Sequence, residues 1–327
     1  MTCKCNSKLY LSCVKLIGLL LCIILFSSSY IFAADKFSVA YIGFSTDKPF
    51  WFALGNAIRK EAELNMITLL DLTPPEPNAL AQARFIEHAI NRKVNALIIG
   101  ADTPSTLTGA LNRALKEKIP IVAIDTKIAH PAVAAFVGTN NHKGARLAGE
   151  YIVKQTRGKG SVLIIGGTPD HPNGEIRKNG VASEVENAGM AVISRYAHWA
   201  DEIAYLITRE EFGKENDITA VFSCWDPGID TVSYSIDGMD LKKRPILVGF
   251  DGLPRTIGYI NIGKVTATVA QDLELMARRS IALVLKVLSH ENYKKEELIE
   301  PYIIDRQFSG IHKRSVQINS EGVKGQQ

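Results

Sequence analysis

Short apolar runs alternate with amphipathic stretches along most of this chain. The apolar runs have the length of strands and are bounded by Gly, Pro and polar clusters. They predict strands at Val39–Gly43, Ile67–Leu72, Ala96–Ile99, Ile121–Ile124, Ala135–Val137, Val162–Ile165, Ala191–Arg195, Ala220–Ser223, Ile246–Val248, Val265–Val269 and Tyr302–Ile304. Apolar residues at helical spacing predict helices at Phe52–Leu64, Ala79–Asn91, Thr106–Lys118, Lys143–Thr156, Glu175–Ala188, Ala200–Phe212, Gly228–Asp237, Leu253–Ile262 and Leu273–Ser289. Apolar strands separated by helices are typical of parallel sheets covered on both faces.

The number of predicted strands argues against a single sheet. Five precede residue 138 and at least as many follow it, so two doubly wound α/β lobes with parallel sheets fit better than one. The length of 327 residues also suits two domains. Because no flexible Pro/Gly/Ser linker divides the halves, we expect lobes joined by several short crossings.

The first 34 residues differ from the rest and predict a secretory signal peptide. Lys4, Lys8 and Lys15 precede the apolar run 16–26, and small residues follow up to Ala34. A basic start, a short apolar core and a small-residue exit are the features of such a signal. We expect cleavage near residue 33 or 34 and a periplasmic protein; a retained N-terminal anchor is the alternative.

Removing this segment changes the apparent chemistry of the chain. Four of the five cysteines lie in it, so the mature chain keeps only Cys224 and cannot form an internal disulfide. Three lysines leave with it, so 35 basic residues face 34 acidic ones and the net charge is +1. A net charge this small does not indicate nucleic-acid binding.

The scattered histidines form no metal motif, and His171 is expected to be a loop residue. We therefore expect neither metal nor cofactor.

Polar and aromatic residues follow several predicted strands. Lys48, Phe50 and Trp51 come shortly after the first strand, and Asp125, Trp225, Asp226 and Asp251 follow later ones. In open α/β sheets ligands bind outside the carboxyl ends of the strands. The pattern therefore predicts a pocket for a molecule with both apolar faces and hydrogen-bonding groups.

Five segments, in this order along the chain, resemble the type I periplasmic sugar-binding proteins, in particular the ribose-binding proteins of ABC importers. The segments are Lys48–Trp51, Ala123–Thr126, Arg177–Gly180, Val248–Gly252 and Thr268–Gln271. The resemblance covers about residues 36–312. It implies two lobes, joined by a three-strand hinge, that enclose a ligand. By analogy the N-lobe is 36–137 plus 271–297, the C-lobe is 138–270 plus 298–315, and 316–327 form a tail.

The resemblance also implies a set of ligand-binding residues. Phe50 and Trp51 match the aromatic pair that clamps the faces of a sugar ring. Asp125 and Asp251 match carboxylates that accept hydrogen bonds from sugar hydroxyls, although a strand-end Asp can also cap a helix. The further positions implied are Lys48, Thr126, Arg177, Trp199, Trp225, Asp226 and Gln271.

Three of these positions depart from the ribose-binding pattern. Lys48 and Trp225 stand where that branch has Asn, and Thr126 stands where it has Arg. These departures put ribose itself in doubt and leave hexoses, deoxy sugars, polyols and sugar acids open. We expect a small carbohydrate or polyol ligand.

The expected function is capture of this ligand by a monomeric protein without enzymatic activity, and its delivery to the permease of an ABC importer. One alternative keeps the fold but has the closed form dock on a sensor kinase or chemoreceptor. A second alternative is a secreted glycoside-acting enzyme, because the pocket would hold paired carboxylates.

Overall fold

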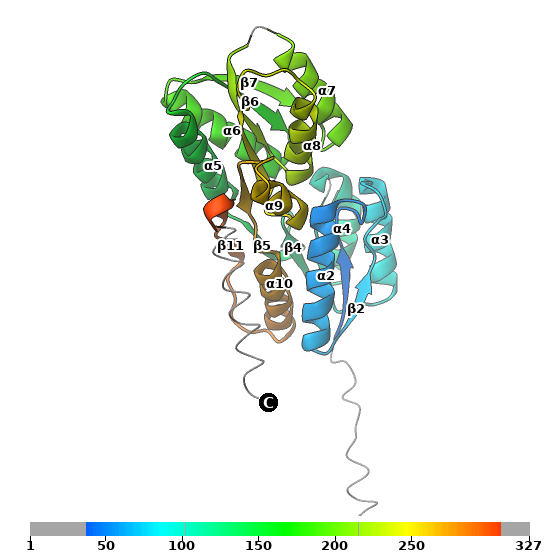
Figure 1. The fold of residues 1–327 in the computed structure, drawn as a ribbon. Coiled ribbons are helices and arrows are strands. Elements are labelled where there is room, and N and C mark those ends of the chain that lie inside the picture. The colour runs from blue at the N-terminus through cyan, green and yellow to red at the C-terminus, as the bar shows by residue number, and fades with distance from the viewer. Residues whose placement is uncertain (1–36, 102, 215, 309–327) are drawn as a thin grey trace, which may run out of the picture.

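The computed structural model describes residues 37–308 except for 102 and 215, and these residues form two α/β lobes (Figure 1). The predicted signal peptide (1–34), the tail (316–327) and the last part of the expected C-lobe (309–315) lie outside the described residues. The two-lobed α/β fold with doubly wound, largely parallel sheets is confirmed.

One lobe, here called the N-lobe, is built on a six-stranded sheet whose paired strands are all parallel. Its order across the sheet is β11 (Glu296–Ile299), β5 (Val133–Thr139), β4 (Ile121–Ile124), β3 (Ala96–Ile99), β1 (Phe37–Ile42) and β2 (Ile67–Asp71). The helices around it are α2 (Pro49–Leu64), α3 (Ala79–Asn91), α4 (Thr108–Lys116) and α10 (Leu273–Leu288), with a short 3₁₀ helix at Pro104–Leu107.

Alternating side chains of the N-lobe strands enter two separate cores. In β1, Val39 and Tyr41 join the cluster that contains residues of α2 and α10. Ala40 and Ile42 join the cluster that contains residues of α3 and α4. Since successive strand residues point to opposite faces, a strand buried on both sides must be apolar at every position.

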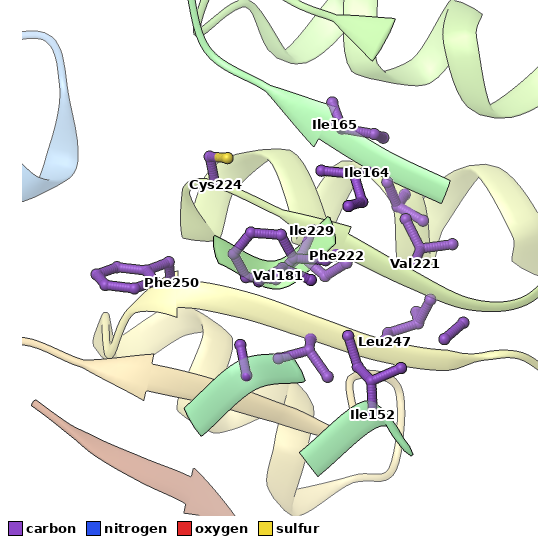
Figure 2. Packing of buried hydrophobic residues seen from close by; sticks show 14 of the residues in the cluster. Ile152, Ile164, Ile165, Val181, Val221, Phe222, Cys224, Ile229, Leu247 and Phe250 are labelled. Carbon is purple, nitrogen blue, oxygen red and sulfur yellow. The ribbon is translucent and has the colours of Figure 1, made fainter. Parts of the chain in front are cut away.

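The other lobe, here called the C-lobe, contains the second six-stranded sheet. Its order is β12 (Tyr302–Asp305), β10 (Ala267–Ala270), β9 (Ile246–Asp251), β8 (Ile218–Ser223), β6 (Ser161–Gly166) and β7 (Ala191–Tyr196). Its helices are α5 (Asn141–Thr156), α6 (Pro172–Asn187), α7 (Asp201–Phe212), α8 (Asp226–Asp237) and α9 (Pro254–Asn261). Figure 2 shows part of its core, where Phe222, Leu247 and Phe250 are fully buried.

Two strands at the sheet edges differ from the expected pattern. β11 was not predicted, because its sequence Glu296-Glu-Leu-Ile299 is short and half acidic, as suits an edge strand. β12 runs antiparallel to β10. The chain passes between the lobes at three places: between β5 and α5, between β10 and α10, and between β11 and β12.

Candidate functional site

A cavity of about 240 Å³ lies between the lobes at the carboxyl ends of their strands. Its volume is below the usual range for small-molecule sites, about 300–1,000 Å³. Both lobes contribute to it. The lining residues are Phe44, Asp47, Lys48, Pro49, Phe50, Trp51, Asp125, His171, Asn173, Arg177, Trp199, Asp201, Trp225, Pro227, Asp251 and Gln271. Nine of the eleven residues singled out in the sequence are among them.

The other two, Thr126 and Asp226, do not line the cavity, which differs from the expectation. Both are fully buried. Thr126 donates its hydroxyl to Oδ2 of Asp125 at 3.1 Å. Asp226 accepts from Oγ1 of Thr268 at 2.6 Å and from the backbone N–H of Leu253 at 2.7 Å. These two side chains support the walls of the cavity.

The N-lobe side of the cavity is mainly aromatic. Trp51 stacks on Phe44 with ring centroids 5.8 Å apart and meets Phe50 edge-on at 5.4 Å. Its indole lies against Gly100, where any Cβ would come within 2.2 Å of the ring. Pro49 begins α2 and so places these rings at the end of β1. The result is a closely packed aromatic surface in which the Phe44 and Trp51 rings are stacked and the Phe50 ring is perpendicular to Trp51.

The C-lobe side carries a second aromatic group. Trp199 meets Trp225 edge-on at 5.6 Å and His171 at 5.2 Å. A Cβ at Gly167 would come within 2.1 Å of the Trp199 ring, so this glycine is needed for the indole to lie where it does. The indole N–H of Trp225 donates to Oδ1 of Asp201 at 3.2 Å.

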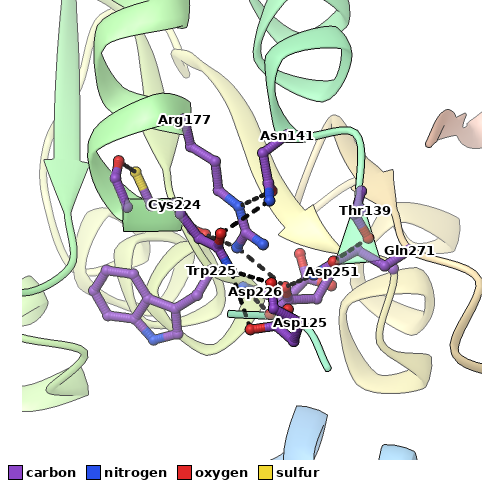
Figure 3. A network of polar contacts seen from close by, with 12 residues as sticks. Asp125, Thr139, Asn141, Arg177, Cys224, Trp225, Asp226, Asp251 and Gln271 are labelled. Carbon is purple, nitrogen blue, oxygen red and sulfur yellow. Dashed lines mark hydrogen bonds and ion pairs between the residues drawn. The ribbon is translucent and has the colours of Figure 1, made fainter. Parts of the chain in front are cut away.

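Arg177 is the centre of a buried polar network on the C-lobe side (Figure 3). Its Nε donates to Oδ1 of Asn141 at 2.8 Å, and Nη1 donates to the backbone carbonyl of Cys224 at 2.9 Å. Nη1 also lies 3.5 Å from Oδ1 of Asp251. The guanidinium packs 3.8 Å from the centroid of the Phe250 ring. These contacts hold the cation in one orientation and leave Nη2 without a bond to any described protein group.

Gln271 extends this network to the crossings between the lobes. Its amide nitrogen donates to Oδ1 of Asp251 at 2.8 Å, and its amide oxygen accepts from Oγ1 of Thr139 at 2.5 Å. Thr139 ends β5, and Gln271 lies between β10 and α10. Gln271 therefore holds the carboxylate of Asp251 in place, and Thr139, at a second crossing, holds Gln271.

Three buried carboxyl groups lie in this region, and two of them, Asp125 and Asp251, interact with the Arg177 guanidinium. Asp125, Asp226 and Asp251 are each at most 5% exposed. Burial raises the pKa of Asp125 and of Asp251, and the nearby Arg177 opposes both shifts. Burial, followed by the neighbouring carboxylate of Asp251, raises the pKa of Asp226 well above its usual value. Since buried charges need partners, the site favours ligand groups that donate hydrogen bonds to carboxylates.

The backbone is strained at three residues that line the cavity. The φ angles of Asp125, Trp199 and Asp251 are 61°, 58° and 136°. Residues other than glycine rarely adopt positive φ angles. Such strain tends to cluster at binding sites, where the surrounding structure over-determines the conformation.

Seven lining residues were not among the predicted ligand-binding residues: Phe44, Asp47, Pro49, His171, Asn173, Asp201 and Pro227. For Asn173 a signal existed, because it lies four residues before Arg177 and therefore on the same face of α6. His171, expected in a loop, caps α6 and lines the cavity. Burial, with the Arg177 charge, lowers the pKa of His171 to about 4.

Within residues 37–308, leaving aside 102 and 215, no helix has the length and apolar content needed to cross a membrane. The same described residues contain no group of three or more His, Cys, Asp or Glu side chains suited to a metal ion.

Comparisons with known proteins agree with this geometry. Residues 39–292 match a family model described as a periplasmic binding protein domain. The D-allose-binding periplasmic protein of Escherichia coli is 28% identical over 268 residues, which cover 79% of this chain and 84% of that protein.

Two solved structures have the same fold. An ABC transporter solute-binding protein from Actinobacillus succinogenes, with bound D-allose, has a TM-score of 0.78 at 22% identity and covers 84% of this chain and 99% of its own. One from Bacillus halodurans, with bound myo-inositol, has a TM-score of 0.79 at 17% identity and covers 86% and 99%. The family model covers most of the chain, so this protein belongs to the periplasmic binding protein domain family.

Proposed function

We propose that this protein captures a small carbohydrate or polyol between its lobes and delivers it to the permease of an ABC importer. The observation that carries the proposal is the composition of the cavity. Flat indole and phenyl rings line both sides, and Asp125 and Asp251 lie at the strand ends. A sugar ring has C–H patches on its faces and hydroxyls around its rim. Aromatic rings bind the former and carboxylates the latter.

The relatives support this ligand class. The E. coli relative is named for D-allose binding, and the two solved structures hold D-allose and myo-inositol. Arg177, the buried cation of the cavity, already lies 3.5 Å from Asp251 and faces Asp125, so it offers a sugar acid little uncompensated positive charge. We therefore propose an uncharged ligand.

In the proposed mechanism the lobes rotate about the three crossings. The proposed lobes follow the boundaries expected from the sequence, with two crossings placed at the ends of β5 and β11, after residues 139 and 299. Ligand stabilises the closed form because only there do both aromatic walls touch it. The closed shape is then presented to the permease. The protein has no catalytic role in this scheme and is secreted to the periplasm by the cleaved segment 1–34.

A binding screen tests the proposal. Trp51, Trp199 and Trp225 are the three tryptophans of the chain, and all line the cavity. A panel of neutral sugars and polyols should therefore contain a compound that changes the tryptophan fluorescence and raises Tm. A panel of sugar acids should not. If neither panel shifts either signal, the proposal fails.

The Asp251→Ala variant links that binding to the site. Losing a charge-assisted hydrogen bond costs about 1.5–3 kcal/mol, so the affinity should fall at least about tenfold. Unchanged affinity would remove Asp251 from the ligand-binding residues. Turnover of a glycoside by the purified protein, lost in Asp251→Asn, would favour the enzyme alternative instead.

A further inference from the structure

A hydrogen bond between protein side chains joins the two lobes at the cavity. Asn173 lies in the first turn of α6 in the C-lobe, and Asp125 follows β4 in the N-lobe. Nδ2 of Asn173 is 3.0 Å from Oδ2 of Asp125 and 3.1 Å from its backbone oxygen. The two residues are 6% and 5% exposed. The contact therefore belongs to the closed form, in which the lobes enclose the cavity, and it is made between protein atoms alone.

The amide of Asn173 is held in the orientation that this bond requires. Its Oδ1 accepts from Nδ2 of Asn141 at 3.2 Å, and Oδ1 of Asn141 in turn accepts from Nε of Arg177. With its oxygen engaged inside the C-lobe, Asn173 directs its NH₂ group at the N-lobe. Little side-chain entropy is then lost when the lobes meet, which makes the bond effective.

The acceptor of this amide is a buried carboxyl oxygen. Burial at low dielectric strengthens the hydrogen bond, and an amide N–H left at this depth without an acceptor would be costly. A second contact between the lobes is apolar: Leu253, which precedes α9 of the C-lobe, is 6% exposed and packs in the N-lobe core cluster that includes Phe44 and Trp51.

We propose that Asn173 is an interlobe latch that stabilises the closed form before ligand binds. It occupies Oδ2 of Asp125 and leaves Oδ1, to which no described residue donates, for the ligand. The latch concerns regulation of the same site, so its consequence for affinity rests on the proposed function. A ligand that selects the closed form binds more tightly when that form is already populated, because apparent affinity scales with the competent fraction.

Small-angle X-ray scattering on the ligand-free protein tests the latch. The variants are Asn173→Ala, and Asn173→Leu, which keeps the shape of the side chain but cannot donate. The matched control is Thr126→Val. It removes another hydrogen bond to the same Oδ2, but one that stays within the N-lobe. Circular dichroism and Tm establish that each variant is folded.

We expect both Asn173 variants to have a larger radius of gyration than the wild type, with the closed-to-open ratio reduced about tenfold, which corresponds to about 1.4 kcal/mol. Thr126→Val should scatter like the wild type. If both Asn173 variants stay as compact as the wild type, or if Thr126→Val opens equally, the latch is excluded.

The same variants separate this proposal from the proposed function. The scattering measurement contains no sugar, so its result does not depend on which ligand the site takes. If a sugar binds the wild type, a saturating concentration should restore the compact form of the Asn173 variants, with the apparent affinity lowered by up to about tenfold. A sugar that binds both variants and the wild type equally would contradict the latch and leave the sugar-binding function standing.

Discussion

The two walls of the cavity are built differently. The N-lobe wall is an aromatic cluster of Phe44, Phe50 and Trp51. Lys48 and Asp47 lie at its partly exposed edge. The C-lobe wall also carries indoles, but its inner end is a polar network centred on Arg177. The N-lobe wall therefore offers shape and apolar area, whereas the C-lobe wall offers directed hydrogen bonds.

This difference separates two tasks in recognition. Stacking on a flat ring is tolerant of hydroxyl configuration, because each sugar face presents C–H groups. A fixed guanidinium and carboxylate discriminate, because a buried polar group left without its partner costs about 1–3 kcal/mol. We expect the C-lobe wall and the strand-end carboxylates to determine most of the selectivity. Both walls should contribute to the affinity.

The largest expected effect comes from Arg177→Met. Arg177 is the one buried Lys or Arg in the described part of the chain, and it faces Asp125 and Asp251. Its loss leaves those carboxyls without a buried cation, so the free energy of unfolding should fall by about 3–5 kcal/mol at neutral pH, and ligand binding should disappear. Denaturant unfolding and calorimetric titration measure both effects.

The control for this variant is Arg146→Met on the exposed face of α5, where Arg146 pairs with Glu150. It should leave stability nearly unchanged, because exposed ion pairs contribute little. A stability loss equal to that of Arg177→Met would contradict the special role given to the C-lobe network.

A smaller effect is expected from adding a methyl group beneath either indole. In Gly100→Ala the new Cβ would meet the ring of Trp51, and in Gly167→Ala that of Trp199. Each indole must then move, so the affinity for the sugar found in the screen should fall about tenfold. Gly109→Ala is the matched control, since a Cβ there meets nothing within 4 Å. Loss of affinity in only one of the two variants would show that one wall dominates.

The buried carboxyls also predict how stability depends on pH. Burial raises the pKa of Asp251 from 3.8 to about 7, so between these values the folded protein binds more protons than the unfolded chain. Stability is then greatest on the acid side and falls as pH rises through this window, by up to about 1.4 kcal/mol per pH unit. Unfolding experiments between pH 5 and 8 should show this fall. In Asp251→Asn the stability should depend less on pH. An equally steep dependence in that variant would show that other titrating groups cause the fall.

The smallest effect is expected at the rim of the N-lobe wall. The Lys48 side chain is 36% exposed and lies 3.9 Å from the carboxylate of Asp47. Because exposed ion pairs contribute little, Lys48→Gln should change ligand affinity by less than about threefold. A larger loss, measured by the same titration, would show that Lys48 reaches the ligand when the lobes close.

Much of the fold could be predicted from the sequence. Strands such as β3 and β4 are apolar at every position because both faces are covered, so their pattern is strong. The edge strand β11 has no such pattern, because only part of it is buried. The strand-end residues Asp125 and Asp251 were also accessible to sequence reasoning, because parallel strands bring their carboxyl ends to one edge of a sheet.

The orientation of neighbouring polar side chains could not be predicted. Asp226 lies just beyond the end of β8, as Asp251 lies at the end of β9, yet it does not line the cavity and instead accepts hydrogen bonds from Thr268 and the backbone of Leu253. The contact of Asn173 with Asp125 could not be predicted either, because Asp125 lies 48 residues away and in the other lobe.

The sequence by itself determined that two sheets form, which residues fill their cores, and which strand ends meet at a site, because these depend on local periodicity and on the burial of apolar surface. Only the tertiary structure decided which polar atoms face one another across the lobes. That choice depends on side-chain directions and distances of about 3 Å between segments far apart in the chain, and no periodicity records them.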